Sequence, residues 1–490
     1  MNKGFRNTAS TVLFLVSSFI IYGSIVELST KDLNPVDKSK KELLTLLKKI
    51  ALPSREFTKA LLQINNAKTT NITHPTFPLI MSKSGRGSRY EELKAGFSFE
   101  YEPDTMPNIG FLVLAAPDPY SGDPLLSIWD LNKQEEIFKY QISKKKLIEE
   151  FNLNKRAKQT LRLKHPIILS DGSLITYLHN GGGTNRSSRV PLLKFDSCGN
   201  LVKVNDKYHY HHSLEIDKNG YIYAQIKGKN QQKYKSKKYN SAMEGFTILD
   251  KELNILNTFW LQKIMEDNKI LTDALIRTEY QYDPFHLNDV HPLIDELTGE
   301  TSVFMSLRQF GLLRFNLTRN KLVWSIVGAT EAQHDITPIS KTGDIISVFN
   351  NGSPKSNLLN NDFENSIILV SNLPVAQIDN NPSYFFGRNL NAFGLGYEEY
   401  KLDFLNEKMR PKTATQGRGK FSNGRRYLFI EETDEGRLIE VDLKAKKILW
   451  SYLNKTEKNN DRLMLSWSRK IEKLPFNLDQ FNLENCKNKL

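Results

Sequence analysis

The chain has 490 residues, enough for two or three ordinary domains or for one large closed architecture. Hydrophobic residues make up 39% and charged residues 25%, a composition that excludes a disordered or fibrous protein. The formal net charge of +13 suits contact with anions, although a solvated basic surface explains it as well. Because the lysines are spread along the chain and no RNA- or DNA-binding motif accompanies them, we expect no nucleic-acid partner.

An uncharged apolar run extends from Ser10 to Val26, after Lys3 and Arg6. Its length is at the lower limit of the roughly 17–25 residues that span a bilayer and exceeds the roughly 7–15-residue core of a secretory signal. No A-x-A cleavage site follows, so we expect residues 1–30 to be a signal anchor that holds an exported protein to the membrane by a single pass. A cleaved signal is the alternative, and the lysines between positions 31 and 49 oppose export because positive charge favours the cytoplasmic side.

The two cysteines, Cys198 and Cys486, leave two alternatives open. In an oxidising compartment they form one disulfide that ties the C-terminal tail to the body, and otherwise they stay unpaired.

Residues 31–100 read as a helical, charged linker region, with helical periodicity over residues 39–66 that is broken at Pro53. From about residue 106 short apolar runs alternate with Gly, Asp and Asn turns, as in an all-β protein. We therefore expect a β-propeller domain over residues 101–470 and a C-terminal tail over residues 471–490.

The apolar runs recur in a four-strand unit. Its first half appears as "HPIILSDGSLITYL" from His165, "HHSLEIDKNGYIYAQI" from His211, "HLNDVHPLIDELTGETSVFMSL" from His286 and "QHDITPISKTGDIISVFNNG" from Gln333. Each is followed by a second pair of strands around a tight turn, such as "PLLKFDSCGNLVKV" or "GLLRFNLTRNKLVWSIV". The spacing is 47 residues from His165 to His212 and 48 from His286 to His334, which is typical of propeller blades.

An opening unit over residues 109–142 and a closing unit over residues 417–453 bring the count to six. We therefore predict a six-bladed β-propeller, with five or seven blades or separate β-sandwiches as alternatives. The longer interval between His212 and His286 accommodates a Lys-rich insertion and the helical segment 261–280.

Three histidines at blade starts are the main site candidates. The first strand of each propeller blade lines the central channel, so His212, His286 and His334 are expected to converge although they lie far apart in the chain. His211 replaces His212 if the register of that pair is displaced by one residue. His165 also begins a unit, but Pro166 follows it and we expect a structural role.

Two further polar residues share this register. Asn288 lies two residues after His286, so both point to one face of a strand. Arg308 follows the next apolar strand, and a guanidinium among histidines needs an anion partner. Imidazoles, an amide and a guanidinium together predict a site that handles anions.

With these residues the chain resembles the bacterial arylsulfate sulfotransferases, the arylsulfotransferase (ASST) family. The resemblance rests on "HHSLEIDKNGYIYA", "DPFHLNDV", "SLRQFG", "QHDITPISKTGDIISVFNNG" and "TATQGRGKFSNGRRYLFIEETDEGRLIEVD", and covers roughly residues 160 to 455. It implies a six-bladed propeller in the periplasm, which the apolar run would hold on the periplasmic side of the inner membrane. It also implies transfer of a sulfuryl group from an aryl sulfate ester to a phenolic acceptor, without a nucleotide sulfate donor. We expect no cofactor and no metal.

The resemblance assigns the nucleophile to His334, supporting histidines to His212 and His286, and anion ligands to Asn288 and Arg308. This agrees with the chemistry, because neutral imidazole is a competent nucleophile near pH 7 and a ping-pong reaction through sulfohistidine would follow. One departure is the N-terminal region. The family carries a β-rich domain there, whereas residues 27–100 of this chain read as helical and charged.

Two other functions compete. A propeller can hold non-haem iron through histidines, as carotenoid-cleaving oxygenases do, and His212, His286 and His291 are the candidate ligands. Arg308 opposes this because it would repel a cation, and His291, next to Pro292, is expected in a loop. The second rival is a non-catalytic binding propeller, whose histidine cluster would tolerate substitution.

Overall fold

The computed structural model describes residues 80–81, 90, 92–106, 109–153, 161–179, 190–228, 243–277, 285–352, 364–377, 381–413, 415–456 and 461–476. The chain divides into two compact units, Met1–Thr73 and His74–Leu490, and every described residue belongs to the second. The apolar run Ser10–Val26, most of the expected linker and Cys486 lie outside the described residues. Within them, no helix has the length and apolar character needed to cross a membrane. Cys198 is disulfide-bonded.

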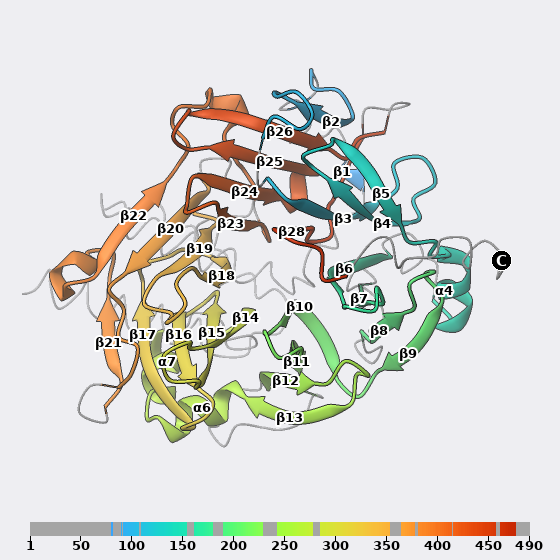
Figure 1. Ribbon diagram of the computed structural model, residues 1–490. Helices are drawn as coiled ribbons and strands as arrows, with labels where there is room; N and C mark the ends of the chain where they lie inside the picture. The colour runs from blue at the N-terminus through green and yellow to red at the C-terminus, as the bar shows by residue number, and fades with distance from the viewer. Residues whose placement is uncertain are drawn as a thin grey trace, which may run out of the picture. The chain divides into compact units, whose positions relative to one another are not determined.

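Six sheets of four or five strands surround a central axis (Figure 1), which confirms the prediction of an all-β, six-bladed propeller. We number the blades 1 to 6 in chain order. The innermost strands are β28, β6, β10, β14, β18 and β23, and all of them lie nearest the centre in Figure 1.

The strands of the six blades have the following bounds. Blade 1 contains β28 (Arg469–Ile471), β3 (Phe111–Pro117), β4 (Pro124–Asp130) and β5 (Glu135–Lys139). Blade 2 contains β6 (Arg162–Ile168), β7 (Leu174–His179), β8 (Leu192–Phe195) and β9 (Leu201–Asn205). Blade 3 contains β10 (His209–Ile216), β11 (Ile222–Lys227), β12 (Glu244–Leu249) and β13 (Ile255–Trp260). Blade 4 contains β14 (Leu287–Ile294), β15 (Thr301–Leu307), β16 (Gly311–Asn316), β17 (Lys321–Val327) and β21 (Ser383–Phe386). Blade 5 contains β18 (His334–Pro338), β19 (Ile346–Asn350), β20 (Ser366–Ser371) and β22 (Gly396–Tyr400). Blade 6 contains β23 (Arg418–Ser422), β24 (Tyr427–Glu432), β25 (Arg437–Asp442), β26 (Lys447–Leu453) and β2 (Gly96–Phe99).

Both ends of the described chain close the ring. The opening unit supplies only three strands of blade 1, and the C-terminal strand β28 pairs with β3 as its innermost strand. At the other end, β2 pairs with β26 and extends blade 6. Strand β2 falls within the span expected to be a linker, because "GFSF" is an apolar run too short for its strand character to stand out in the sequence.

The apolar residues fill the spaces between blades. Six hydrophobic clusters occur among the described residues, and each joins the facing sheets of two neighbouring blades. Both faces of most sheets are therefore buried, which explains why many strands read as continuous apolar runs and do not alternate with polar residues.

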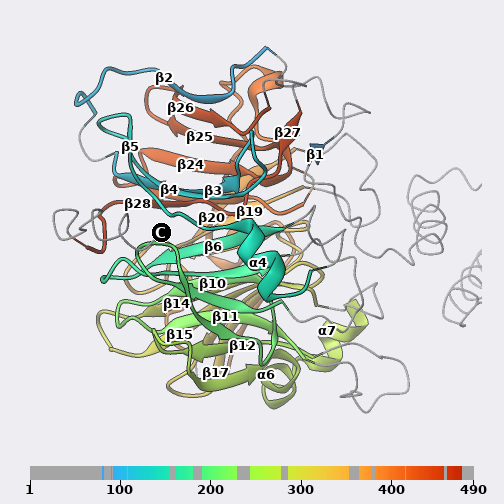
Figure 2. The ribbon, with the colours of Figure 1, turned by 90° about the vertical axis from the view of Figure 1, so that its right-hand side faces the viewer.

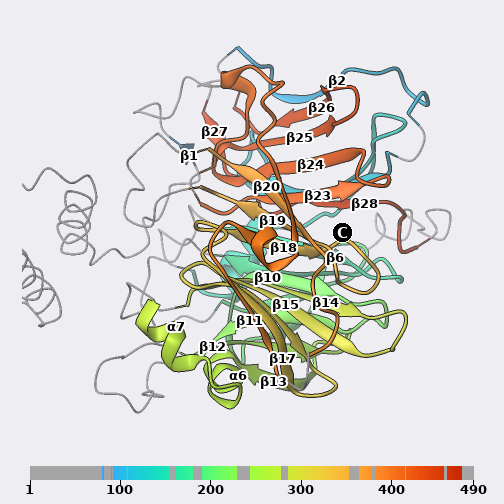
Figure 3. The same cartoon turned by 90° about the vertical axis from the view of Figure 1, so that its left-hand side faces the viewer.

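Short helices lie between some of the strands. Helix α4 (Lys144–Glu150) follows β5, and α6 (Leu261–Asp267) and α7 (Leu271–Arg277) occupy the segment expected to be helical after β13. The 3-10 helices are η1 (Leu390–Phe393), η2 (Glu407–Met409) and η3 (Thr433–Glu435), and a short sheet joins β1 (Ile80–Met81) to β27 (Arg462–Leu463). Figures 2 and 3 show β1, β27 and α7 toward one face of the propeller.

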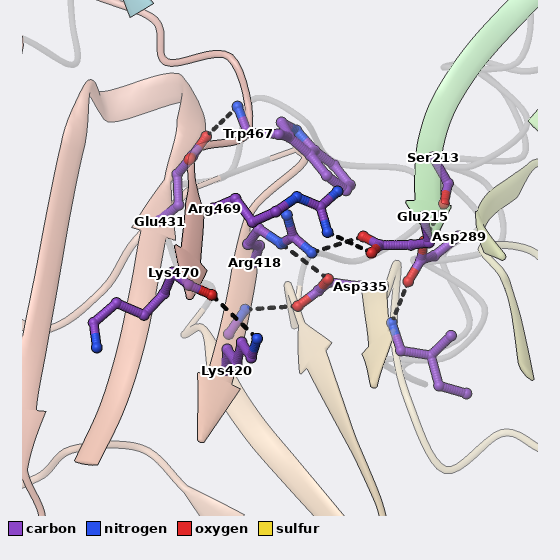
Figure 4. A network of polar contacts seen from close by, with 12 residues as sticks. Ser213, Glu215, Asp289, Asp335, Arg418, Lys420, Glu431, Trp467, Arg469 and Lys470 are labelled. Carbon is purple, nitrogen blue, oxygen red and sulfur yellow. Dashed lines mark hydrogen bonds and ion pairs between the residues drawn. The ribbon is translucent and has the colours of Figure 1, made fainter. Parts of the chain in front are cut away.

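A buried network of charged groups links the innermost strands (Figure 4). The carboxylate of Glu215 on β10 lies 2.9 Å from Nη2 of Arg418 on β23 and 2.5 Å from Nη1 of Arg469 on β28. Arg418 also contacts Oδ1 of Asp335 at 3.2 Å, and Arg469 donates to the main-chain oxygen of Pro166 on β6 at 2.9 Å. These four side chains connect five of the six blades.

Asp289 completes the circuit from blade 4. Its Oδ1 accepts from the hydroxyl of Ser213 at 2.5 Å, and its Oδ2 accepts from the main-chain N–H of Ile336 at 2.8 Å. Asp335 similarly accepts from the main-chain N–H of Gly419 at 2.9 Å. Each carboxylate thus ties its own inner strand to the next, and the network reaches all six blades.

Replacing Gly110 tests the closure by β28. Gly110 has φ +78°, and an added Cβ would lie 2.5 Å from the main-chain oxygen of Ile471. Gly110→Ala should therefore displace β28. The thermal midpoint should fall further than it does when a side chain is only placed on left-handed backbone, which costs about 1–2 kcal/mol. Gly220→Ala is the matched control, because Gly220 has φ +85° but nothing within 4 Å. Equal losses in the two variants would show that β28 does not press on Gly110.

Replacing Glu215 tests the charge network. Burial alone would raise the pKa of Glu215, but Arg469 and Arg418 outweigh it and hold the pKa well below its usual value. Glu215→Gln should cost about 3–5 kcal/mol of unfolding free energy, because it removes the carboxylate that pairs with Arg469 and leaves Arg418 with Asp335 alone. Since the folded-state pKa is depressed, this contribution is complete above the ordinary value of 4.5 and is lost as the pH falls below it.

Chemical denaturation between pH 2 and 8 measures both effects. Glu252→Gln is the control, because Glu252 pairs with Lys194 at 2.9 Å but is largely exposed, and such pairs contribute about 0–1 kcal/mol. A loss for Glu215→Gln no larger than that of the control would contradict the role given to the network.

Candidate active site

Each blade has at least one non-glycine residue with left-handed backbone within the innermost strand or up to two residues before it. These residues are Trp467 (φ +62°), His165 (+55°), His212 (+55°), His286 (+47°), Ala332 (+53°), Asp335 (+38°) and Gln416 (+60°). None is a glycine, and such residues are uncommon outside turns and functional sites. The strand pairing is irregular at these positions in blades 2 to 5. A bulge of this kind re-aims the side chain of the extra residue, which a regular strand would hold on one face of its sheet.

The predicted histidines meet at this point. The Nε2 atoms of His212 and His286 are 3.2 Å apart, so one nitrogen donates and the other accepts. The ring of His334 lies 6.0 Å from the ring of His212. Of the pair His211 and His212, it is His212 that contacts His286 through a ring nitrogen, while the ring of His211 stacks edge-on against His212 at 3.7 Å.

Arg308 and Asn288 flank the same histidines. The main-chain N–H of Arg308 donates to the oxygen of His286 at 3.0 Å, and the charge of Arg308 acts directly on the His334 ring. Asn288 is fully buried and donates from Nδ2 to the oxygen of Gln333 at 2.7 Å, next to His334. The structure therefore brings all five predicted site residues together at the starts of β14 and β18 and around the bulge in β10.

The hydrogen bonds of His334 define its tautomer. Its Nδ1 lies 2.7 Å from Oδ1 of Asn351 and 3.1 Å from the oxygen of Ala332. Asn351 is itself fixed, because its Nδ2 donates to the oxygens of Thr413 at 3.0 Å and Gln416 at 2.7 Å. Two oxygen acceptors therefore face Nδ1, which must carry the proton, and Nε2 holds the lone pair.

The electrostatics keep the imidazoles neutral. Burial lowers the pKa of His334 well below 6.5, the positive charge of Arg308 lowers it further, and the hydrogen bond to Asn351 acts in the opposite direction. His212 is partly buried as a residue. Burial of its imidazole and the neighbouring histidines His211, His286 and His334 lower the pKa of His212 well below 6.5. A neutral nucleophilic nitrogen beside a fixed cation suits an anionic substrate.

Sequence reasoning missed four residues of this site: Lys164, Asn351, Gln416 and Trp467. Asn351 follows β19 and lies two residues after Phe349, which pairs with His334 in the hairpin. The polar ending "VFNNG" therefore indicated a polar side chain near His334. Lys164, Gln416 and Trp467 reach the site from blades 2, 6 and 1, and no feature of their sequence surroundings indicates this.

Two other histidines have different surroundings. His165 is fully buried, with its ring 4.0 Å from that of Trp467, and neither ring nitrogen has a hydrogen-bond partner. His291, expected in a loop, lies within β14 because the strand continues through Pro292 to Ile294, and burial lowers its pKa to about 4.

The rival metal site receives no support from the arrangement of ligands. Among the described residues, no group of three or more His, Cys, Asp or Glu side chains is arranged to hold a metal ion. The Nε2 atoms of His212 and His286 face each other at hydrogen-bond distance, and Arg308 supplies a positive charge beside them. These donors fit a site for an anion better than a site for a cation.

The His334 tautomer can be measured directly. In ¹⁵N-labelled protein, His334 should carry its proton on Nδ1 and stay neutral from pH 8 to below 6.5, because its pKa is lowered. Asn351→Leu removes the stronger acceptor and should let the two tautomers mix. A His334 ring that titrates near 6.5, or that carries its proton on Nε2, would contradict this assignment.

Comparisons with known proteins identify the family of this chain. The family model of the arylsulfotransferases (ASST) matches residues 165–455, which is more than half of the chain. This span contains all five predicted site residues. No curated protein matches the chain. Among solved structures, the hydrazine synthase of Kuenenia stuttgartiensis is similar at 10% identity. The match covers 70% of this chain and 79% of that chain, with a TM-score of 0.36. The family match shows that this chain belongs to the arylsulfotransferase family.

Proposed function

We propose that this protein transfers a sulfuryl group from an aryl sulfate ester to a phenolic acceptor by a ping-pong reaction through a sulfohistidine at His334. Membership of the arylsulfotransferase family implies sulfuryl transfer between aryl compounds. The observation that carries the finer mechanism is the tautomer of His334. Its Nδ1 faces two oxygen acceptors, which leaves a lone pair on Nε2 beside the cation Arg308.

In the first half-reaction, the lone pair of His334 Nε2 forms an N–S bond with the sulfur of the donor. The S–O bond to the aryl group breaks, and its electron pair leaves on the phenolic oxygen. The imidazole becomes an N-sulfoimidazolium, and the oxygens of Asn351 and Ala332 at Nδ1–H stabilise the positive charge it gains. Arg308 and Asn288 would hold the sulfuryl oxygens as their charge changes.

The pair His212 and His286 handles the proton. An anionic ester between Arg308 and these rings favours uptake of one proton, which the pair passes to the leaving phenolate. In the second half-reaction, the pair takes the proton of the acceptor phenol as its oxygen attacks sulfur. The N–S bond then breaks, and its electrons return to His334 Nε2, so that ester and phenol exchange one sulfuryl group without net proton change.

No nucleotide sulfate donor is needed in this scheme, because the aryl ester is itself the activated donor. The reacting group is held by imidazole, amide and guanidinium groups, so the scheme also needs no cofactor. A non-catalytic propeller would have no use for a nucleophile with a fixed tautomer, and the site therefore favours an enzyme.

We further propose that the protein is exported and held on the periplasmic side of the inner membrane by the apolar run Ser10–Val26, or released there if the signal is cleaved. The length of that run supports membrane insertion. The disulfide at Cys198 supports an oxidising compartment.

An assay with a chromogenic aryl sulfate and a phenol tests the function. Wild-type protein should release the donor phenol in a burst, carry the mass of one sulfuryl group on the peptide containing His334, and show parallel-line ping-pong kinetics. His334→Ala should lose transfer by at least about 10³-fold, as loss of a nucleophile usually does. The matched control is His179→Ala, which changes the last residue of β7, on the second strand of blade 2 and outside the histidine cluster.

Equal rates for wild type and His334→Ala would refute the nucleophile assignment. Stoichiometric iron or zinc in the purified protein, together with metal-dependent turnover, would support the metal enzyme in its place.

A further inference from the structure

Both ring nitrogens of His334 belong to one closed circuit of hydrogen bonds. Nδ1–H donates to Asn351, and Nδ2 of Asn351 donates to the oxygen of Gln416 at 2.7 Å. The main-chain N–H of the same Gln416 donates back to Nε2 of His334 at 3.3 Å. One residue of blade 6 therefore touches the nucleophilic nitrogen and also orients the group behind the ring.

The side chain of Gln416 is held from two other blades. Its Oε1 accepts from Nζ of Lys164 on β6 at 2.5 Å and from Nε1 of Trp467, just before β28, at 3.2 Å. Lys164 and Trp467 are 3% and 1% exposed, so neither donor is free to turn to water. Gln416 itself is only partly buried.

The main chain at Gln416 requires this support. Its φ of +60° lies in the left-handed region, where a residue with a side chain costs about 1–2 kcal/mol. On its N-terminal side, Thr415 is fixed by Asp434 of η3, which accepts from its N–H at 2.8 Å. On its C-terminal side Gly417, with φ +107°, follows without a side chain. The bonds to Lys164 and Trp467 are therefore the side-chain restraints that set the direction of the Gln416 N–H.

We propose that Lys164 is a positioning residue for sulfuryl transfer, which acts by holding Gln416 so that its main-chain N–H points at the reacting nitrogen of His334. This inference rests on the proposed function. In the resting site the N–H donates to the lone pair of Nε2. When that lone pair forms the N–S bond, the N–H loses its acceptor and donates to a sulfuryl oxygen, the atom then closest to it. The same N–H thus holds the ring before attack and stabilises the sulfuryl group after it.

Lys164 is suited to this role by its place. It lies one residue before the span that matches the family, and it approaches the site from blade 2, which supplies none of the five predicted site residues. Its Nζ donates to Gln416, and no ion pair joins it to a carboxylate among the described residues. Burial lowers the pKa of Lys164 well below its ordinary value, and Asp434 and Glu431 oppose this only from beyond contact distance. A lysine whose role was only to form an ion pair would have a carboxylate within contact distance, as Lys194 on β8 of the same blade has in the largely exposed Glu252.

The test compares Lys164→Met with Lys194→Met and with Gln416→Met. All three replacements keep an unbranched apolar stem, and Lys194 is also nearly buried, so it controls for loss of a buried lysine in blade 2. Rapid-mixing experiments should follow formation of sulfated enzyme from an aryl sulfate and its discharge to a phenol. Lys164→Met should slow both half-reactions by about 10–100-fold with little change in donor KM, because one transition-state donor is misplaced. Lys194→Met should match wild type.

A double variant shows whether Lys164 acts through Gln416. If it does, Lys164→Met combined with Gln416→Met should be no slower than the slower single variant, since both remove one contact. Multiplied losses, or wild-type rates in Lys164→Met, would overturn the proposal. Should Lys164→Met fail to fold, Gln416→Met alone decides, because this partly exposed residue keeps its main-chain N–H, and a full transfer rate would overturn the proposal.

The ¹⁵N shift of His334 Nε2 gives a readout that does not depend on activity. It should move in Lys164→Met, where the N–H of Gln416 is released, while the proton stays on Nδ1 because Asn351 is unchanged. An unchanged shift would overturn the role of Lys164. Absence of any sulfuryl transfer in wild-type protein would instead overturn the proposed function, so the two failures are distinguishable.

Discussion

The pairing of Glu215 with Arg418 and Arg469 is the interaction on which the rest of this structure depends. It joins β10, β23 and β28 at the axis, where six sheets converge and little space remains for apolar side chains. Burying a carboxylate and two guanidinium groups is costly unless all of them are paired. The pairing is complete only when blades 1, 3 and 6 are in place, so closure of the ring and neutralisation of its charges require each other.

This axial network allows the strain of the layer next to it. At least one non-glycine residue per blade has left-handed backbone, at a cost of about 1–2 kcal/mol each. The cost is offset because the neighbouring residues are anchored. Asp335 accepts from Gly419, Asp289 accepts from Ile336, and Glu431 accepts from the N–H of Trp467 at 2.9 Å. Strained backbone at the strand starts is what directs His212, His286 and the chain around His334 toward the axis.

The chemistry of the site follows from which atoms face His334. Two oxygens at Nδ1 assign the proton, and a main-chain N–H and the lone pair meet at Nε2. Burial, with the charge of Arg308, lowers the pKa of the ring and keeps it neutral. Each of these groups comes from a different stretch of the chain. The fold makes Nε2 of His334 the nucleophilic nitrogen, because a histidine without these contacts is not held in one tautomer or orientation.

The sequence by itself predicted a six-bladed ring and the approximate starts of the inner strands, while five or seven blades and the register of the His211–His212 pair stayed open. Turn residues and apolar runs repeat at a nearly constant spacing, and each repeat is one sheet whose two faces must be buried by its neighbours. This was enough to place His212, His286, Asn288, Arg308 and His334 at blade starts, where they converge. Only the tertiary structure decided the contributions of Lys164, Asn351, Gln416 and Trp467, and the use of β28 to complete blade 1. Those residues act through contacts between blades. A repeat pattern specifies where a strand begins, but the partner of a side chain across the axis depends on how six blades close and on the left-handed turns that such closure imposes.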